Sequence, residues 1–186
     1  MLTLYGMTSF RYYIGLFTAD YILYCIPMSL FLLFIEILDL SIFKDNLDHF
    51  SFLMLMFGAN LVTFTYFFSI FFSDVNAAFK KAPLIMLFLG VILPFALVFT
   101  TIATTEAKNK DNVLGIEAKI FYYFFYILDP LMTFFMGIVY MLLISLNQKW
   151  NVDLYAPNLE NSAIVMGCQF VFYFSIVLFV DWYRCG

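Results

Sequence analysis

The sequence predicts an all-α fold: a polytopic bundle of transmembrane helices with four full spans and one proline-broken re-entrant hairpin. Hydrophobic residues make up 65% of the chain and charged residues only 12%, whereas an average soluble domain is about 45–50% apolar and about 25% charged. A water-soluble core cannot hide so much apolar surface in a chain of this size. The apolar residues also form continuous runs without alternation, which favours helices over barrel strands. We therefore expect an integral, multi-pass membrane protein.

Four apolar runs are long enough to cross a bilayer, which takes about 20 mostly apolar residues. They cover about residues 12–37, 50–73, 82–105 and 161–180. The first run contains Asp20 and Glu36, and the other three carry no charge. Because backbone polar groups in lipid must bond within their own segment, each run is expected to form a helix. Pro27 and Pro94 are expected to kink two of these helices.

A fifth apolar run, about residues 120–146, is interrupted by Asp129 and Pro130. Proline removes a backbone donor and clashes with the preceding turn, and it moves the residue before it away from helical geometry. Each arm alone is too short to span a bilayer. The residues leave two structures open, a kinked single span and a re-entrant hairpin. Irregular backbone at membrane depth needs cover from protein or water in either case.

The polar residues give no support for an enzyme. His49 is the only histidine, and neither a Gly-x-x-x-x-Gly-Lys-Ser/Thr phosphate loop nor a His-Glu-x-x-His motif occurs. The cysteines, Cys25, Cys168 and Cys185, are too far apart in sequence to indicate a disulfide framework or a metal site. No basic run could bind the phosphates of nucleic acid. We expect no catalytic residue, metal or cofactor in this chain, and the lipid bilayer as a partner.

Three polar residues within the apolar runs are candidate functional positions: Asp20, Asn60 and Asp129. A carboxylate near mid-membrane costs roughly 2.5–3.5 kcal/mol, so such groups usually face other helices or water. Asp20 is therefore either a polar partner or pathway-lining group, or an acid close enough to the headgroups to stay hydrated. The same choice is open for Asp129, whose carboxylate could also cap the turn that follows.

Small and hydroxylated residues recur along the second run. Such residues let helices approach closely and form interhelical hydrogen bonds. We expect this face, together with Asp20, to point toward the interior of the bundle, and ordinary helix packing explains the pattern as well as a functional role does. The residues are Gly58, Ala59, Asn60, Thr63, Thr65 and Ser69.

Four motifs follow one another along nearly the whole chain. They are Leu4-Tyr5-Gly6-Met7 with Tyr12-Tyr13, Asp20 and Pro27; Tyr66-Phe67-Phe68-Ser69; Asp129-Pro130 with Met136-Gly137; and the closing Val180-Asp181-Trp182. In order and spacing they resemble the transmembrane domain of subfamily A ABC transporters, specifically the C-terminal part of an ABC-2 type domain. Each motif consists mostly of apolar letters, so the resemblance lies in their order.

The resemblance implies the membrane-spanning part of an ATP-driven transporter for lipids or lipid-like molecules. Residues 1–11 would be a cytosolic coupling segment, and residues 120–146 an outer-leaflet hairpin. ATP and Mg would bind a nucleotide-binding domain that this sequence lacks, so the chain would be a fragment that needs this domain and further transmembrane helices as partners. The coupling helix would contain Leu4, Tyr5, Gly6, Met7 and Phe10.

A second class of function fits the same composition, namely a small structural or assembly subunit of a membrane complex such as a respiratory complex. It predicts burial against partner chains and no coupling helix. Basic residues are divided almost evenly between the two sides of the predicted topology, so the positive-inside rule does not orient the chain. The sequence leaves the membrane and the substrate open.

Overall fold

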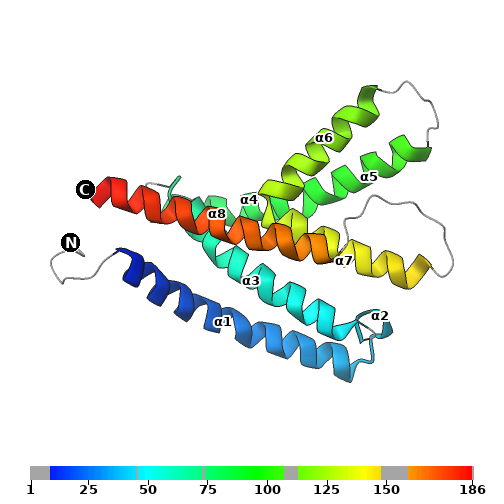
Figure 1. Cartoon of the computed structure of the whole chain (residues 1–186), viewed down its shortest axis with the longest axis horizontal. Coiled ribbons are helices and arrows are strands. Elements are labelled where there is room, and N and C mark those ends of the chain that lie inside the picture. Colours follow the sequence, from blue (N-terminus) through cyan, green and yellow to red (C-terminus); the bar gives the residue numbers. More distant parts are fainter. Residues whose placement is uncertain (1–8, 45, 73, 107–112, 148–158, 186) are drawn as a thin grey trace. The chain divides into compact units, whose positions relative to one another are not determined.

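A computed structural model describes residues 9–44, 46–72, 74–106, 113–147 and 159–185, and every regular element in these ranges is a helix. The predicted all-α class is therefore confirmed. The elements are α1 (Ser9–Ile37), α2 (Ser41–Lys44), α3 (Leu47–Ser69), α4 (Val75–Leu87), the π-helical segment η2 (Phe88–Ile92), α5 (Leu93–Glu106), α6 (Val113–Leu128), α7 (Pro130–Asn147) and α8 (Leu159–Cys185) (Figure 1). They form two compact units, Met1–Ser73 with Met166–Gly186, and Asp74–Val165.

Four helical stretches in the described ranges are long and apolar enough to cross a membrane, and they overlap the four predicted spans. They are Phe10–Ile37, Leu47–Ser69, Lys80–Leu97 and Glu160–Tyr183. The second ends earlier than the predicted residue 73, because the amides of Ile70, Phe71 and Phe72 bond three residues back instead of four. Such tight turns commonly end an α-helix.

In the first unit, α1 and α3 lie side by side and are joined through the short α2 (Figure 1). Residues of α3 supply much of the buried surface, including Phe50, Leu53 and Phe64. By contrast, only 11% of the apolar span in α1 is buried. Exposed side chains such as Leu23 and Phe34 are 63% and 59% accessible, which suits contact with lipid and not with water.

A close contact at Gly58 holds α1 against α3. A Cβ atom at this position would lie 2.0 Å from Cε1 of Tyr24, so only glycine leaves room for the ring. The Tyr24 hydroxyl donates a hydrogen bond to the Met54 carbonyl oxygen at 3.0 Å, which fixes the ring over Gly58.

The end of α1 is a Schellman cap centred on Asp39. Asp39 has a φ of 52°, its amide bonds the Glu36 carbonyl, and the Leu40 amide bonds the Ile35 carbonyl. These two bonds satisfy carbonyls at the helix end. The Asp39 carboxylate also pairs with Lys44 of α2 at 2.5 Å, which links the cap to the next helix.

The Lys44 side chain should control the titration of Asp39. A hydrogen bond from Lys44 and its positive charge lower the pKa of Asp39. Since the folded-state pKa lies below the unfolded one, the stabilising effect is present above the unfolded pKa and is lost as pH falls through the folded pKa. In Lys44→Gln, carboxyl NMR titration in micelles should show the Asp39 pKa rising toward its ordinary value, whereas Lys80→Gln should leave it unchanged. An unchanged Asp39 pKa in Lys44→Gln would contradict the pairing.

In the second unit, α4, η2 and α5 form one continuous helical stretch that contains Pro94. Just before this proline the helix widens, and the Leu93 amide bonds the Phe88 carbonyl five residues back. Such π-type turns within α-helices are often found at kinks and next to prolines. In α1, by contrast, the helix continues through Pro27.

The interrupted run becomes two helices, Ile120–Leu128 and Pro130–Leu142, that meet at 110°. A bend greater than a right angle excludes a slightly kinked helix and corresponds to either a broken span or a re-entrant loop, and we term the two helices the folded-back pair. Its inner faces pack together through Tyr122, Tyr126, Met132 and Met136. The predicted proline-broken pair is confirmed.

At the break between α6 and α7, a side chain replaces the backbone hydrogen bond that the proline removes. The Asp129 amide still bonds the Phe125 carbonyl at 2.7 Å. Pro130 has no donor for the next carbonyl, that of Tyr126, and the Thr133 hydroxyl donates to this oxygen at 2.6 Å instead. Asp129 Oδ1 accepts from the Leu131 amide at 3.0 Å and so caps α7.

Removing the Thr133 hydroxyl should destabilise the folded-back pair. Thr133→Val keeps the shape of the side chain but leaves the buried Tyr126 carbonyl without this donor, at a cost of about 1–3 kcal/mol. Thr65→Val is the matched control, because the exposed Thr65 hydroxyl bonds only the Leu61 carbonyl of its own helix, and a change within about 0.5 kcal/mol is expected. Unfolding in mixed micelles measures both, and equal effects would count against this role of Thr133.

Candidate functional site

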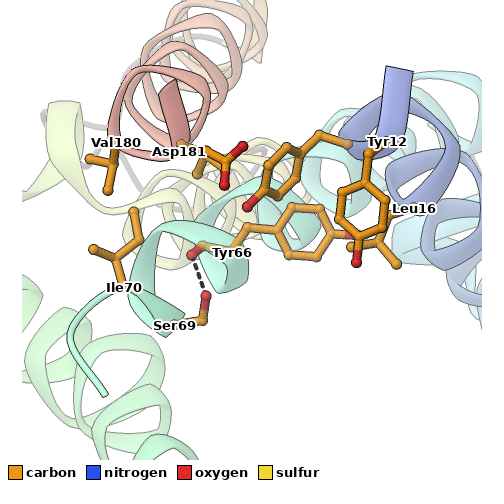
Figure 2. Close-up of a pocket in the computed structure, with 9 residues that line it drawn as sticks. Tyr12, Leu16, Tyr66, Ser69, Ile70, Val180 and Asp181 are labelled. Carbon is orange, nitrogen blue, oxygen red and sulfur yellow. Dashed lines mark hydrogen bonds between the residues drawn. The ribbon is translucent and has the colours of Figure 1, made fainter. Parts of the chain in front are cut away.

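A polar cavity of about 220 Å³ lies within the first unit, between the start of α1, the end of α3 and the end of α8 (Figure 2). Tyr12, Tyr66 and Asp181 reach it from these three helices. Its other lining residues are Tyr13, Leu16, Ser69, Ile70, Val177 and Val180. The cavity therefore lies at the ends of three apolar helices.

Aromatic rings form much of the cavity wall. Tyr12 and Tyr13 meet edge to face with their ring centroids 5.4 Å apart, and Tyr13 lies 6.3 Å from Tyr66. The Ser69 hydroxyl donates to the Tyr66 carbonyl oxygen at 2.7 Å (Figure 2). Among the described residues that line it, Asp181 is the one acidic or basic side chain, so the site combines aromatic rings with a carboxylate.

Asp20 is paired with Tyr66 across the α1–α3 interface. The Tyr66 hydroxyl donates a short hydrogen bond to Asp20 Oδ2. Both side chains also line a second, apolar depression together with Tyr24. Of the two possibilities that the sequence left open for Asp20, this geometry corresponds to a polar partner of another helix. Tyr66 contacts both Asp20 and the cavity and so connects the two features.

Asn60 lies fully buried in α3 and bonds to α8. Its Nδ2 donates to the Met166 carbonyl at 2.7 Å and to the Met56 carbonyl at 3.2 Å. Its Oδ1 is buried and has no hydrogen-bond partner among the described residues. Asn60 therefore acts as an interhelical contact, and it does not line the cavity.

Asp129 is separate from the cavity and belongs to the second unit. It is 3% exposed. Its Oδ1 accepts from the Leu131 amide and so caps α7, which is one of the roles that the sequence predicts for it. Nearby, the hydroxyls of Tyr126 and Ser162 lie 2.9 Å apart. The candidate residues thus do not form one site: Asp20 is bonded to Tyr66, a residue of the cavity wall, whereas Asn60 and Asp129 hold helices together.

Of the predicted coupling residues, Leu4, Tyr5, Gly6 and Met7 lie outside the described residues, and Phe10 is an exposed residue of α1. The expectation that the whole small-residue face of α3 points inward is wrong for Thr65 and Ser69, which are exposed. Their hydroxyls bond carbonyls of their own helix, so they need no neighbouring helix.

Sequence reasoning missed the cavity tyrosines as functional residues. Tyr12, Tyr13 and Tyr66 stand out little in a chain with 13 tyrosines. The signal that could have found them is their position, since aromatic residues cluster where spans meet the interface. Asp181 gave a similar signal as an acid at the end of the last apolar run.

The comparisons with known proteins do not assign the chain to a family: no family model, no curated protein and no solved structure matches it.

The Asp20–Tyr66 contact should show strong energetic coupling. In a double-mutant cycle of Asp20→Asn and Tyr66→Phe, we expect a coupling of about 1.5–3 kcal/mol, because the bond involves a charged acceptor. Tyr24→Phe is the control, since the Tyr24 hydroxyl bonds Met54 instead, and its effect should add to that of Asp20→Asn within about 0.5 kcal/mol. Reversible unfolding in mixed micelles gives both values, and additivity in the first cycle would show that the contact contributes nothing.

Proposed function

We propose that the chain is the membrane-spanning part of an ATP-driven transporter of lipid-like molecules, with ATP hydrolysed by a nucleotide-binding domain outside this sequence. The observation that carries the proposal is the order of elements: α1, α3 and the α4–α5 stretch, then a folded-back pair, then α8. This is the order implied by the motifs that resemble subfamily A ABC transporters. The proposal includes residues 1–11 as the segment that contacts the ATPase.

Two physical features support a role in transport. A folded-back pair holds non-helical backbone inside an apolar segment, and such breaks occur where protein or a water-filled path covers them. The carboxylate of Asp20 lies within the first apolar stretch and accepts a hydrogen bond from Tyr66, which lines the polar cavity. Ionisable groups within spans usually mark functional positions. The phosphate-loop motif does not occur in the sequence, and the proposal therefore assigns ATP hydrolysis to a domain outside these residues.

A structural subunit of a membrane complex is the second candidate, and the exposure of α1 favours it. Most of the apolar span of this helix is accessible, including Ile26, Leu33 and Phe34. Lipid would cover such a surface, and so would the helices of a larger assembly. The two candidates differ in whether a nucleotide-binding chain accompanies the protein.

Purification from native membranes in mild detergent, by a tag after Gly186, tests the proposal. We expect a chain with a phosphate-binding loop to co-purify in stoichiometric amount. Replacing Leu4, Tyr5, Met7 and Phe10 by alanine should reduce its recovery about tenfold, which corresponds to about 1.4 kcal/mol of lost contact energy. The matched control replaces Leu38 and Leu40, at the opposite end of α1, and should not reduce recovery.

The same purification separates the two candidates. A large assembly without any nucleotide-binding chain would refute the transporter and identify a structural subunit. Recovery of the ATPase with equal yield from the alanine variant and the control would refute the coupling segment alone.

A further inference from the structure

Asp20 places a carboxyl group within a span and between two helices. It belongs to the 28-residue apolar stretch Phe10–Ile37 and lies about 15 Å along the helix from the start of that stretch, at a rise of 1.5 Å per residue. A carboxylate in an apolar environment is costly to keep charged, and a proton removes that charge. We propose that Asp20 is a proton-binding site, which takes up and releases protons through the hydroxyl of Tyr66.

Tyr66 lies between Asp20 and the polar cavity. Its hydroxyl donates a hydrogen bond to Asp20 Oδ2, and its side chain lines both the polar cavity and the apolar depression that contains Asp20 (Figure 2). The cavity has a volume of about 220 Å³, which can hold several water molecules at about 30 Å³ each. A phenol hydroxyl both donates and accepts hydrogen bonds, so Tyr66 can accept from water in the cavity while it donates to Asp20.

The transfer step balances without an ionised tyrosine. A hydronium ion in the cavity gives its proton to the Tyr66 oxygen while the phenol's own proton moves to Asp20 Oδ2. The products are water, a neutral phenol and a neutral carboxyl group. Release of the proton follows the same path in reverse.

A proton suits the depression around Asp20 better than a metal ion does. Apart from Asp20 and Tyr66, its lining consists of Tyr24, Leu61, Val62 and Thr65. The hydroxyls of Tyr24 and Thr65 are bonded to backbone carbonyls. Metal ions such as Ca²⁺ and Mg²⁺ require about six oxygen ligands, and no group of three histidine, cysteine, aspartate or glutamate side chains that could hold a metal occurs among the described residues.

Titratable residues on three helices surround this part of the first unit. They are Tyr66 on α3, Asp181 on α8, and Tyr12, Tyr13, Tyr21, Tyr24 and Cys25 on α1. Tyrosine ordinarily titrates near pH 10 and cysteine near pH 8.5, so a carboxyl is the group expected to change below neutral pH. Asp181 faces the cavity side of Tyr66, and the proton path does not depend on its charge. A readout assigned to Asp20 itself separates the two acids.

Labelling with dicyclohexylcarbodiimide, a lipid-soluble reagent, tests the site on the full chain in nanodiscs. A protonated carboxyl adds across one C=N bond of the reagent to give an O-acylisourea, which rearranges to a stable N-acylurea without losing an atom. Mass spectrometry of peptides should show this adduct on Asp20, in an amount that falls as pH rises. Asp48, an exposed aspartate in the first turn of α3, is the control and should react with a water-soluble carbodiimide instead. A folded protein without the adduct on Asp20 at any pH would overturn the proposal.

The route through Tyr66 is tested by time-resolved infrared spectroscopy after transfer into D₂O. The carboxyl band of Asp20 is identified by its loss in Asp20→Asn. In Tyr66→Phe its hydrogen–deuterium exchange should slow on the order of a hundredfold, the low end of what a positioned proton-transfer group contributes. Tyr24→Phe removes a hydroxyl from the same depression, but one that bonds Met54, and should leave the rate unchanged.

Equal exchange rates in folded Tyr66→Phe and in the unaltered protein would overturn the route through Tyr66. Circular dichroism establishes that each variant is folded. Both measurements use this chain without ATP or a partner, so their outcome is independent of the proposed transport function.

Discussion

The need to satisfy every backbone polar group without water governs this structure. In a regular helix the backbone groups bond one another. Where a helix is interrupted, other groups must supply the missing hydrogen bonds. At Pro130 the Thr133 hydroxyl replaces the missing donor, and the Asp129 carboxylate accepts from the Leu131 amide at the start of α7. At Pro94 the helix widens into a π-segment, and at Asp39 a left-handed residue closes the end of α1. Three breaks thus have three local solutions.

Polar side chains follow the same constraint within the first unit. Asn60 uses a buried amide to bond α8, and Tyr66 bonds the carboxylate of Asp20. Each contact joins elements far apart in sequence, so it specifies which helix faces which. Apolar side chains alone would specify this pairing weakly, because lipid tails and leucine side chains are equally apolar. Tyr66 also lies in the wall of the cavity, so one residue serves both helix pairing and the candidate site.

The sequence predicts the helices better than it predicts their contacts. Continuous apolar runs of the right length define the spans, and Asp129-Pro130 marks the break in the fifth run, because both depend on local properties. The partners of Asp20 and Asn60 depend on how helices meet, and nothing in the sequence points to Tyr66 or to the Met166 carbonyl. Thr65 and Ser69 show that a small polar residue does not always mark a helix contact, because their exposed hydroxyls bond carbonyls of their own helix.

The contact between Tyr24 and Gly58 has a mechanical consequence. The ring fills the space that a side chain would occupy, and its hydroxyl is tied to the backbone of the facing helix. Rotation of α1 about its axis, or sliding along α3, would have to break this hydrogen bond and move the ring off Gly58. The contact therefore opposes relative motion of the two helices.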